Sequence, residues 1–465
     1  MKTYDELKYE NKNKWNDLSD GDRSEMFAFS DDYKDYLGKG KTERKCNDLS
    51  VELAKAAGFV LLDSKNELKA GDKVYSVNRG KGIVLAVIGE EPVKSGTNIV
   101  GAHIDVPRLD LKPNPLYEDG GFSFFKTHYY GGIKKYQWTA IPLAIHGVVV
   151  KADGSLVDIN IGEDENDPVF CISDLLPHLA QDQMAKKMSE AIAGEGLNVL
   201  IGNTPDSDKD AKEAVKSNTL KLLNEKYGIK EEDFISAELE IVPAFMPKDV
   251  GFDRSMVAGY GHDDRVCSFA ALRAILDMEK PMRTAICLLV DKEEIGSCGN
   301  TGMQSRWFEN FIAKLASKQS ENYSDIQTRE ALANSMCLSA DVGAAFDPNY
   351  PEVVEKRNTA IMNGGLMITK YTGSRGKSGA SDASAEFVGK VRKIFNDNNI
   401  LWQSGTLGKV DLGGGGTIAQ YVANLDVDTL DCGVPLLSMH SPYEVAGKVD
   451  IYMAYKGYKA FMLAK

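Results

Sequence analysis

Two adjacent glutamates follow a short apolar run in the middle of the chain. The run at 285–290 is uncharged and partly β-branched, which predicts a buried strand ending at Asp291-Lys292-Glu293-Glu294. Neighbouring Glu side chains point in different directions, so one can bind a metal ion while the other moves protons between water and a substrate. The alternative is a solvated loop, because clusters of charged residues are usually exposed.

Histidine and aspartate residues stand at the ends of three other apolar runs. These runs are 98–102 before His103 and Asp105, 335–340 before Asp341, and 434–439 before His440. In open α/β sheets, sites form at the carboxyl ends of the strands, so these distant side chains can converge. A lone histidine after a strand is more often structural, but an Asp two residues on can accept the second ring N–H of a metal-bound imidazole. We therefore expect Asp105 to orient His103.

A further acidic pair, Asp263-Asp264, opens a helical run at 266–276. Capping of this helix is one explanation. A second comes from the whole set, because two imidazoles and three carboxylates exceed the three protein ligands of a usual catalytic zinc and suit a pair of ions. Asp263 would bridge the two ions.

The other ligands in this arrangement are His103 and Asp341 for one ion, and Glu294 and His440 for the other. Such a centre would lower the pKa of a bridging water and polarise a carbonyl oxygen. Glu293, beside Glu294, would then act as the general base that passes the proton to a leaving amine.

The elements that position these residues indicate an α/β protein with an insertion. Helical patterns before Gly58, a hairpin at 73–78 and 82–89, and the strands above form a catalytic domain split into residues 1–106 and 248–465. Residues 107–247 have the character of a β-rich insertion, with strands expected at 121–127, 144–150, 156–161 and 234–242.

Composition restricts the class of protein. The chain has 465 residues, 43% hydrophobic and 26% charged, with a formal net charge of -13, which disfavours nucleic-acid and membrane-surface partners. Seven cysteines without a Cys-x-x-Cys pair predict reduced thiols. The polar N-terminus and the lack of an uncharged run of about 18 residues predict a cytoplasmic protein.

The ordered motifs resemble those of the aspartyl aminopeptidase family of dinuclear zinc exopeptidases, in its bacterial type. The matching segments are His103-Ile104-Asp105, Asp263-Asp264, Asp291 to Ser297, Ser339-Ala340-Asp341 and Met439-His440-Ser441. The resemblance runs nearly end to end. It implies a three-layer α/β sandwich with a mixed central sheet, an inserted dimerisation domain that helps to shape the site, and homodimers that assemble into a dodecamer.

The resemblance also implies the activity: removal of N-terminal residues from peptides, acidic ones in the best-known members, with two Zn²⁺ ions. Oxygen and imidazole ligands also accept Mn²⁺ or Co²⁺. An ungapped match to the family sequence through Phe269 and Leu272 implies that Asp263 is the bridging residue, with Asp264 as the alternative.

The substrate-binding residues depart from the family pattern. Arg375 and Lys377 are the basic residues that would bind an acidic side chain, but their register is shifted by one. A histidine that reaches a neighbouring subunit is missing from 141–146, where His146 is the available substitute. Gly415 and Gly416 are expected to line the substrate cleft, since the glycine run lacks the spacing of a nucleotide-binding loop.

Two other functions remain open. The same metal pair serves carboxypeptidases and deacylases, which act on the other end of a peptide or on an acyl group. A noncatalytic assembly protein with the same fold is the third possibility. The intact Glu293 and the full ligand set argue against it, because a scaffold needs neither.

Overall fold

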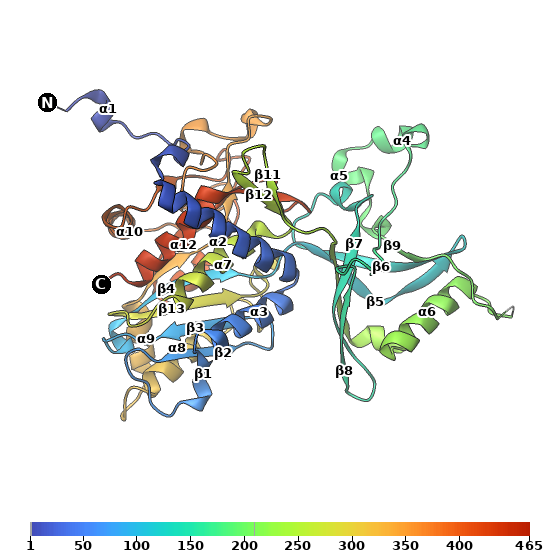
Figure 1. The fold of residues 1–465 in the computed structure, drawn as a ribbon, viewed down its shortest axis with the longest axis horizontal. Helices are drawn as coiled ribbons and strands as arrows, with labels where there is room; N and C mark the ends of the chain where they lie inside the picture. The colour runs from blue at the N-terminus through green and yellow to red at the C-terminus, as the bar shows by residue number, and fades with distance from the viewer. Residues whose placement is uncertain (1, 209) are drawn as a thin grey trace. The chain divides into compact units, whose positions relative to one another are not determined.

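The computed structural model describes residues 2–208 and 210–465. These residues form two compact units (Figure 1). The first unit comprises the chain up to Asp105, then Pro247–Met439 and Tyr443–Lys465, and the second comprises Val106–Met246 and His440–Pro442. The predicted insertion at 107–247 falls on the second unit, and its role in dimerisation stays a prediction.

A mixed sheet forms the centre of the first unit. In the described part of the chain its nine strands have the order β1-β2-β3-β13-β4-β14-β18-β16-β17. Their bounds are Val60–Leu61 (β1), Lys73–Val77 (β2), Ile83–Val87 (β3), Thr284–Val290 (β13), Thr97–His103 (β4), Met336–Ser339 (β14), Asp428–Gly433 (β18), Leu366–Thr369 (β16) and Trp402–Ser404 (β17). Strands β13, β4, β14 and β18 are parallel, whereas β3 and β16 run antiparallel to their neighbours β13 and β18.

Strand β13 shows why the apolar runs of this sheet do not alternate with polar residues. Ala285, Cys287 and Leu289 pack into one hydrophobic core, and Ile286, Leu288 and Val290 pack into a second. Helices cover both faces, so both sets of side chains are buried. The predicted three-layer sandwich is confirmed.

The helices of the two outer layers come from all three chain segments of the first unit (Figure 1). One core contains residues of α2 (Asp20–Lys39), α3 (Glu43–Ala56), α7 (His262–Leu276), α10 (Ala385–Asp397) and α12 (Lys448–Met462). The other contains residues of α8 (Trp307–Ser317), α9 (Asp325–Ala333) and α11 (Ala419–Ala423). Helix α1 (Tyr4–Leu7) precedes them in the chain. Among the described residues, no helix combines the length and the apolar character needed to cross a membrane.

A smaller sheet in the first unit corrects one prediction. Its strands are β11 (Lys248–Val250), β12 (Met256–Gly259), β20 (Glu444–Gly447), β19 (Pro435–Leu437) and β15 (Gly343–Ala344), in that order. The strand expected at 434–439 is present but shorter, at Pro435–Leu437, and it lies in this smaller sheet instead of the central one. The central sheet uses β18, which ends at Gly433. A Cβ at Gly433 would lie 1.8 Å from the carbonyl oxygen of Asp341, and Pro435 has no N–H to donate.

The second unit is built on an antiparallel sheet. Its described strands have the order β8-β7-β10-β5-β6-β9, with the bounds Leu156–Ile161 (β8), Leu143–Val150 (β7), Ala237–Pro243 (β10), Arg108–Asp119 (β5), Phe122–Tyr130 (β6) and Val199–Gly202 (β9). The helices here are α4 (Gln181–Met184), α5 (Met188–Ala191) and α6 (Ala214–Tyr227).

The sequence prediction misses β5 and β9 of this sheet and starts β10 too early. Strand β10 begins at Ala237 rather than at 234, because Glu231–Ser236 form a 3₁₀ turn. Strand β5 was not predicted, since Pro113 and Pro115 interrupt its pattern. A shift in the pairing register between Leu111 and Leu116 accommodates these prolines within the strand.

The packing of β13 predicts the stability of the first unit. Leu288 is 0% exposed, so Leu288→Ala should lower the free energy of unfolding by about 2–5 kcal/mol through lost burial and a residual cavity. Leu61→Ala in β1 is the control, because Leu61 is 51% exposed and its truncation should cost about 0.5 kcal/mol or less. Denaturant unfolding followed by circular dichroism measures both, and equal losses would contradict the assignment of Leu288 to the core.

Candidate active site

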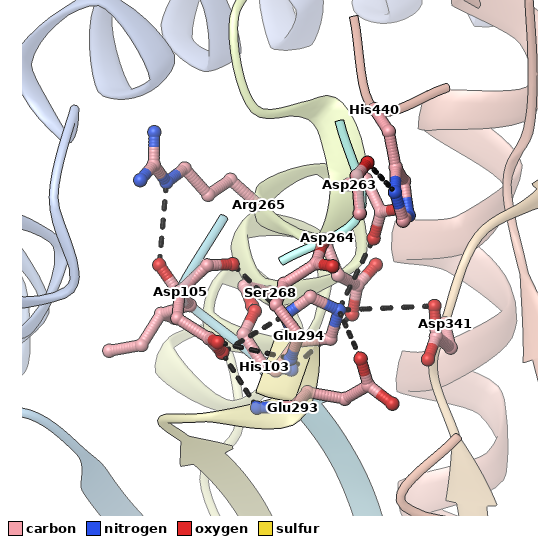
Figure 2. A network of polar contacts seen from close by, with 12 residues as sticks. His103, Asp105, Asp263, Asp264, Arg265, Ser268, Glu293, Glu294, Asp341 and His440 are labelled. Carbon is pink, nitrogen blue, oxygen red and sulfur yellow. Dashed lines mark hydrogen bonds and ion pairs between the residues drawn. The ribbon is translucent and has the colours of Figure 1, made fainter. Parts of the chain in front are cut away.

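The carboxyl ends of three parallel strands bring the predicted site residues to one edge of the central sheet. His103 is the last residue of β4 and pairs with Val290 of β13, directly before the loop with Glu293 and Glu294. On its other side β4 pairs with β14, two residues before Asp341. Figure 2 shows these side chains together with Asp263, which lies in the first turn of α7.

The ring of His103 has a defined orientation. Its Nδ1 lies 3.0 Å from the backbone oxygen of Asp105 and 3.3 Å from the carboxylate Oδ1 of the same residue. Both oxygens accept, so Nδ1 carries a proton. Nε2 is the nitrogen left for a metal ion, which would take the place of the proton that Nε2 shares with Asp263. Nε2 lies 3.2 Å from Asp263 Oδ1 and 4.0 Å from Asp341 Oδ1. Ser268 Oγ fixes the backbone by donating to the His103 carbonyl oxygen at 2.6 Å.

Asp105 also holds the loop after β13. Its Oδ1 accepts the backbone N–H of Glu293 and its Oδ2 accepts that of Glu294, both at 3.1 Å. Asp105 is 0% exposed, so these charge-assisted bonds form away from water. The sequence predicted that Asp105 orients His103, and the structure adds its contact with both glutamate amides.

The loop after β13 is not a solvated acidic loop. Asp291 is 1% exposed, and the side chain of Glu293 is 16% exposed. Oε2 of Glu293 lies 4.0 Å from Nε2 of His103. The alternative interpretation of this segment as a surface charge cluster is therefore wrong.

Two groups of side chains have the spacing of metal ligands. His103, Asp263 and Asp341 offer ligand atoms within 4.8 Å of one another, and so do Asp263, Glu294 and His440. Asp263 belongs to both groups. Imidazole nitrogen and carboxylate oxygen are the donors that zinc accepts, so the residues present fit a divalent ion.

His440 follows β19 and has a fixed ring as well. Its Nδ1 lies 2.8 Å from the carbonyl oxygen of Gly132, which can only accept a hydrogen bond. The proton therefore sits on Nδ1, and Nε2 is the nitrogen available to a ligand.

The first group concentrates negative charge in a buried place. Burial raises the pKa of Asp341 well above its usual range, and the carboxylates of Asp264, Glu293 and Asp263 add to this while His103 opposes it. For His103, burial lowers the pKa, but hydrogen bonds to Asp105 and Asp263 outweigh it and leave the pKa well above its ordinary value. A divalent cation supplies the positive charge that such a cluster of acceptors favours.

The two aspartates at the start of α7 have different environments. Asp264 is 0% exposed, lies in neither ligand group, and its Oδ2 is 3.4 Å from the backbone nitrogen of His103. Burial raises the pKa of Asp264 well above its usual range. Asp263 instead belongs to both ligand groups. Its backbone N–H donates a hydrogen bond to Glu444 Oε2 at 3.1 Å.

Sequence reasoning missed Glu444 and Ser268 as supports of the site. Neither stands in a motif: Glu444 opens the short strand β20, and Ser268 lies inside α7. Their contacts depend on how β20 and α7 pack against the site, which no local pattern reports.

The predicted substrate-binding glycines and basic residues lie on two loops that touch. The backbone nitrogen of Gly373 donates to the Gly415 oxygen at 3.0 Å, and a Cβ at Gly414 would lie 2.3 Å from the Gly373 oxygen. Arg375 and Lys377 are exposed on the first loop, and Gly416 is exposed on the second. Their role in substrate binding stays a prediction.

His146 lies inside the second unit. It is 2% exposed in β7, and its Nε2 is 2.8 Å from Glu163 Oε1. This burial favours a structural role, and substrate binding by His146 stays a prediction.

Known proteins resemble this chain along nearly its whole length. A "Probable M18 family aminopeptidase 1" of Clostridium acetobutylicum is 53% identical over 461 residues, which cover 98% of this chain and 99% of the relative. The crystal structure of an M18 family aminopeptidase from Thermotoga maritima matches with a TM-score of 0.94 at 46% identity, covering 98% of this chain and 99% of that one.

A more distant structure, described as the mApe1 dodecamer of S. cerevisiae, shares the fold with a TM-score of 0.75 at 21% identity, covering 94% of this chain and 97% of that one. The family model described as "Aminopeptidase I zinc metalloprotease (M18)" matches residues 36–462. The resemblance drawn from the sequence motifs is thereby confirmed, and the chain belongs to the aminopeptidase I zinc metalloprotease (M18) family, a family of metal-dependent aminopeptidases.

Proposed function

We propose that this aminopeptidase removes single N-terminal residues from peptides with two divalent ions held by His103, Asp263, Asp341, Glu294 and His440. One observation carries the proposal: Nε2 of His103 faces Asp263 and Asp341 at the edge of the sheet, with Glu293 beside them. The membership of Asp263 in both ligand groups supports a bridged pair of ions rather than one. Zn²⁺ fits the family, and Mn²⁺ or Co²⁺ fits the same donors.

When bound, the ions polarise the scissile carbonyl and lower the pKa of the attacking water. The chain's own residues supply the rest. Glu293 takes the proton of the water and passes it to the leaving amine, from a backbone that Asp105 holds at 3.1 Å. Asp105 keeps His103 in one tautomer through the same buried contacts.

The substrate end and the assembly form the finer part of the proposal. Arg375 and Lys377 would bind an acidic side chain, Gly415 and Gly416 would line the cleft, and His146 would stand in for the histidine that the inserted domain is expected to supply. Self-association into homodimers and a dodecamer is supported by the distant yeast structure, which is described as a dodecamer. Exposed apolar side chains of the second unit, among them Leu176, Leu179 and Met184, also support a contact between copies.

Removing the general base tests the mechanism. Glu293→Gln should keep its bound metal and lose roughly 10²–10⁴ in kcat, because a neutral amide cannot accept the proton of the water. Glu321→Gln, on an exposed residue, is the control. Steady-state kinetics and metal analysis of both proteins decide the matter, and full activity in Glu293→Gln would remove this residue from the reaction.

Removing the shared ligand tests the metal centre. Asp263→Ala should lose bound metal, because Asp263 belongs to both ligand groups. Asp397→Ala, at the exposed end of α10, should retain it. Elemental analysis of the purified proteins measures this, and a chelator should inactivate the wild type until Zn²⁺ is returned. Equal metal content in the two variants would exclude Asp263 as a ligand.

Blocking the peptide N-terminus separates an aminopeptidase from a carboxypeptidase or deacylase. Peptides with a free N-terminal amine should be shortened from that end, whereas their N-acetylated forms should resist, since the site would bind the free amine. Mass spectrometry of the products identifies the end that is cut. Equal cleavage of acetylated peptides would show that the enzyme acts on another bond.

A further inference from the structure

The loop that carries Glu293 and Glu294 closes on itself at its base. It leaves β13 at Asp291 and returns at Thr301, whose Oγ1 donates to Asp291 Oδ2 at 2.6 Å. The two residues are 1% and 2% exposed, so this bond is shielded from water. We call this contact the Asp291–Thr301 clasp.

The loop above the clasp is internally tied. The backbone nitrogen of Ser297 donates to the Lys292 oxygen at 2.7 Å, and that of Gly296 donates to the Glu293 oxygen at 2.8 Å. Gln304 Nε2 adds a bond of 2.8 Å to the Gly296 oxygen. A Cβ at Gly302 would lie 2.4 Å from the Ser297 oxygen, so the chain segments approach closely. Because these hydrogen bonds hold the loop in one conformation, a change in the position of its base would move the whole loop.

The outer contacts show what the base controls. The carboxylate of Asp105 accepts hydrogen bonds from the backbone N–H groups of Glu293 and Glu294. At the other end of the loop, Asn78 Nδ2 donates to the Asn300 oxygen at 3.0 Å, next to Thr301. Glu293 and Glu294 follow Asp291 by only two and three positions. Because they are so close in the chain, a change in the position of Asp291 would be passed on to the two glutamates.

The Asp291–Thr301 hydrogen bond stabilises a buried carboxylate that lies near other acidic groups. Asp291 is buried near the carboxylates of Glu43 at the start of α3 and Asp105 after β4, with Lys81 of the β2–β3 turn as the opposing charge. Lys81 Nζ lies 3.6 Å from Glu43 Oε1, a residue that is 1% exposed. Among these like charges the Thr301 hydroxyl is a donor aimed directly at the Asp291 carboxylate, which holds the side chain in one place.

We propose that Asp291 and Thr301 are positioning residues for the hydrolytic step, because their clasp sets the tilt at which Glu294 reaches the metal centre and Glu293 reaches the water. This inference rests on the proposed function and adds to it two residues that touch neither substrate nor metal. A misplacement of about 1 Å is enough to cost up to about 10²-fold in rate in a site of this kind.

Thr301→Val tests the clasp, because it keeps the shape of the side chain and removes the hydroxyl. At saturating Zn²⁺ we expect kcat to fall by about 10- to 100-fold with KM nearly unchanged. Thr301→Ser restores the hydroxyl and should recover most of the rate. Thr328→Val is the matched control, since Thr328 is a buried threonine of α9 whose hydroxyl bonds to Tyr323.

The outcomes distinguish positioning from a general loss of stability. Wild-type kcat in Thr301→Val, an equal loss in Thr328→Val, or failure of Thr301→Ser to recover activity would each overturn the proposal. Should Thr301→Val not fold, Asp291→Asn and Asp291→Leu address the same contact. The Asn amide oxygen can still accept the Thr301 hydroxyl, so Asp291→Asn should keep most of kcat, whereas Asp291→Leu should lose it. A loss in Asp291→Asn as deep as that in Asp291→Leu would overturn the clasp.

Glu293→Gln, assayed alongside, separates this inference from the function on which it rests. Full activity in Glu293→Gln would end the proposed mechanism. An inactive Glu293→Gln together with a fully active Thr301→Val would end only the clasp.

Discussion

The site depends on the buried Asp105, which joins a histidine at the end of one strand to a loop at the end of the next. Its backbone oxygen lies 3.0 Å from His103 Nδ1, and its carboxylate accepts the amides of Glu293 and Glu294. No part of Asp105 is exposed. A buried carboxylate is stable only when hydrogen-bond donors surround it. Asp105 therefore links the His103 ring and the backbone of both glutamates through one buried residue.

A second constraint is the density of negative charge around His103. Asp263 and Asp341 face the His103 Nε2, and Oε2 of Glu293 lies 4.0 Å from the same nitrogen. Asp264, next to Asp263 in the chain, is also buried. Burial of carboxylates without compensating charge is costly, and the raised pKa of Asp341 expresses that cost. A bound divalent cation would offset this cost, because its positive charge would counter the repulsion among these oxygens. The same crowding that would weaken an ordinary core is therefore suited to a metallopeptidase.

Backbone geometry supports the proposed roles of the two glutamates. They are adjacent in a short 3₁₀ turn, so their side chains leave the chain in different directions while their amides meet one acceptor. Glu294 belongs to a ligand group with Asp263, and Glu293 lies beside His103. The Asp291–Thr301 clasp fixes the base of the loop that carries this turn, which is the positioning role proposed for these two residues.

The sequence alone determined the order of the motifs, the family they resemble and the buried strands that precede His103, Glu293 and Asp341. Each of these signals is local, since apolar runs and the polar residues after them are neighbours in the chain. The contacts between distant segments instead follow from the packing of the folded chain. The tertiary structure separated Asp263 from the adjacent Asp264, and it placed the strand expected before His440 in another sheet. The central strand β18 ends at Gly433, where the chain passes close to Asp341, and Pro435 has no N–H to continue the pairing. Contacts of this kind depend on packing across hundreds of residues, and no spacing along the chain encodes them.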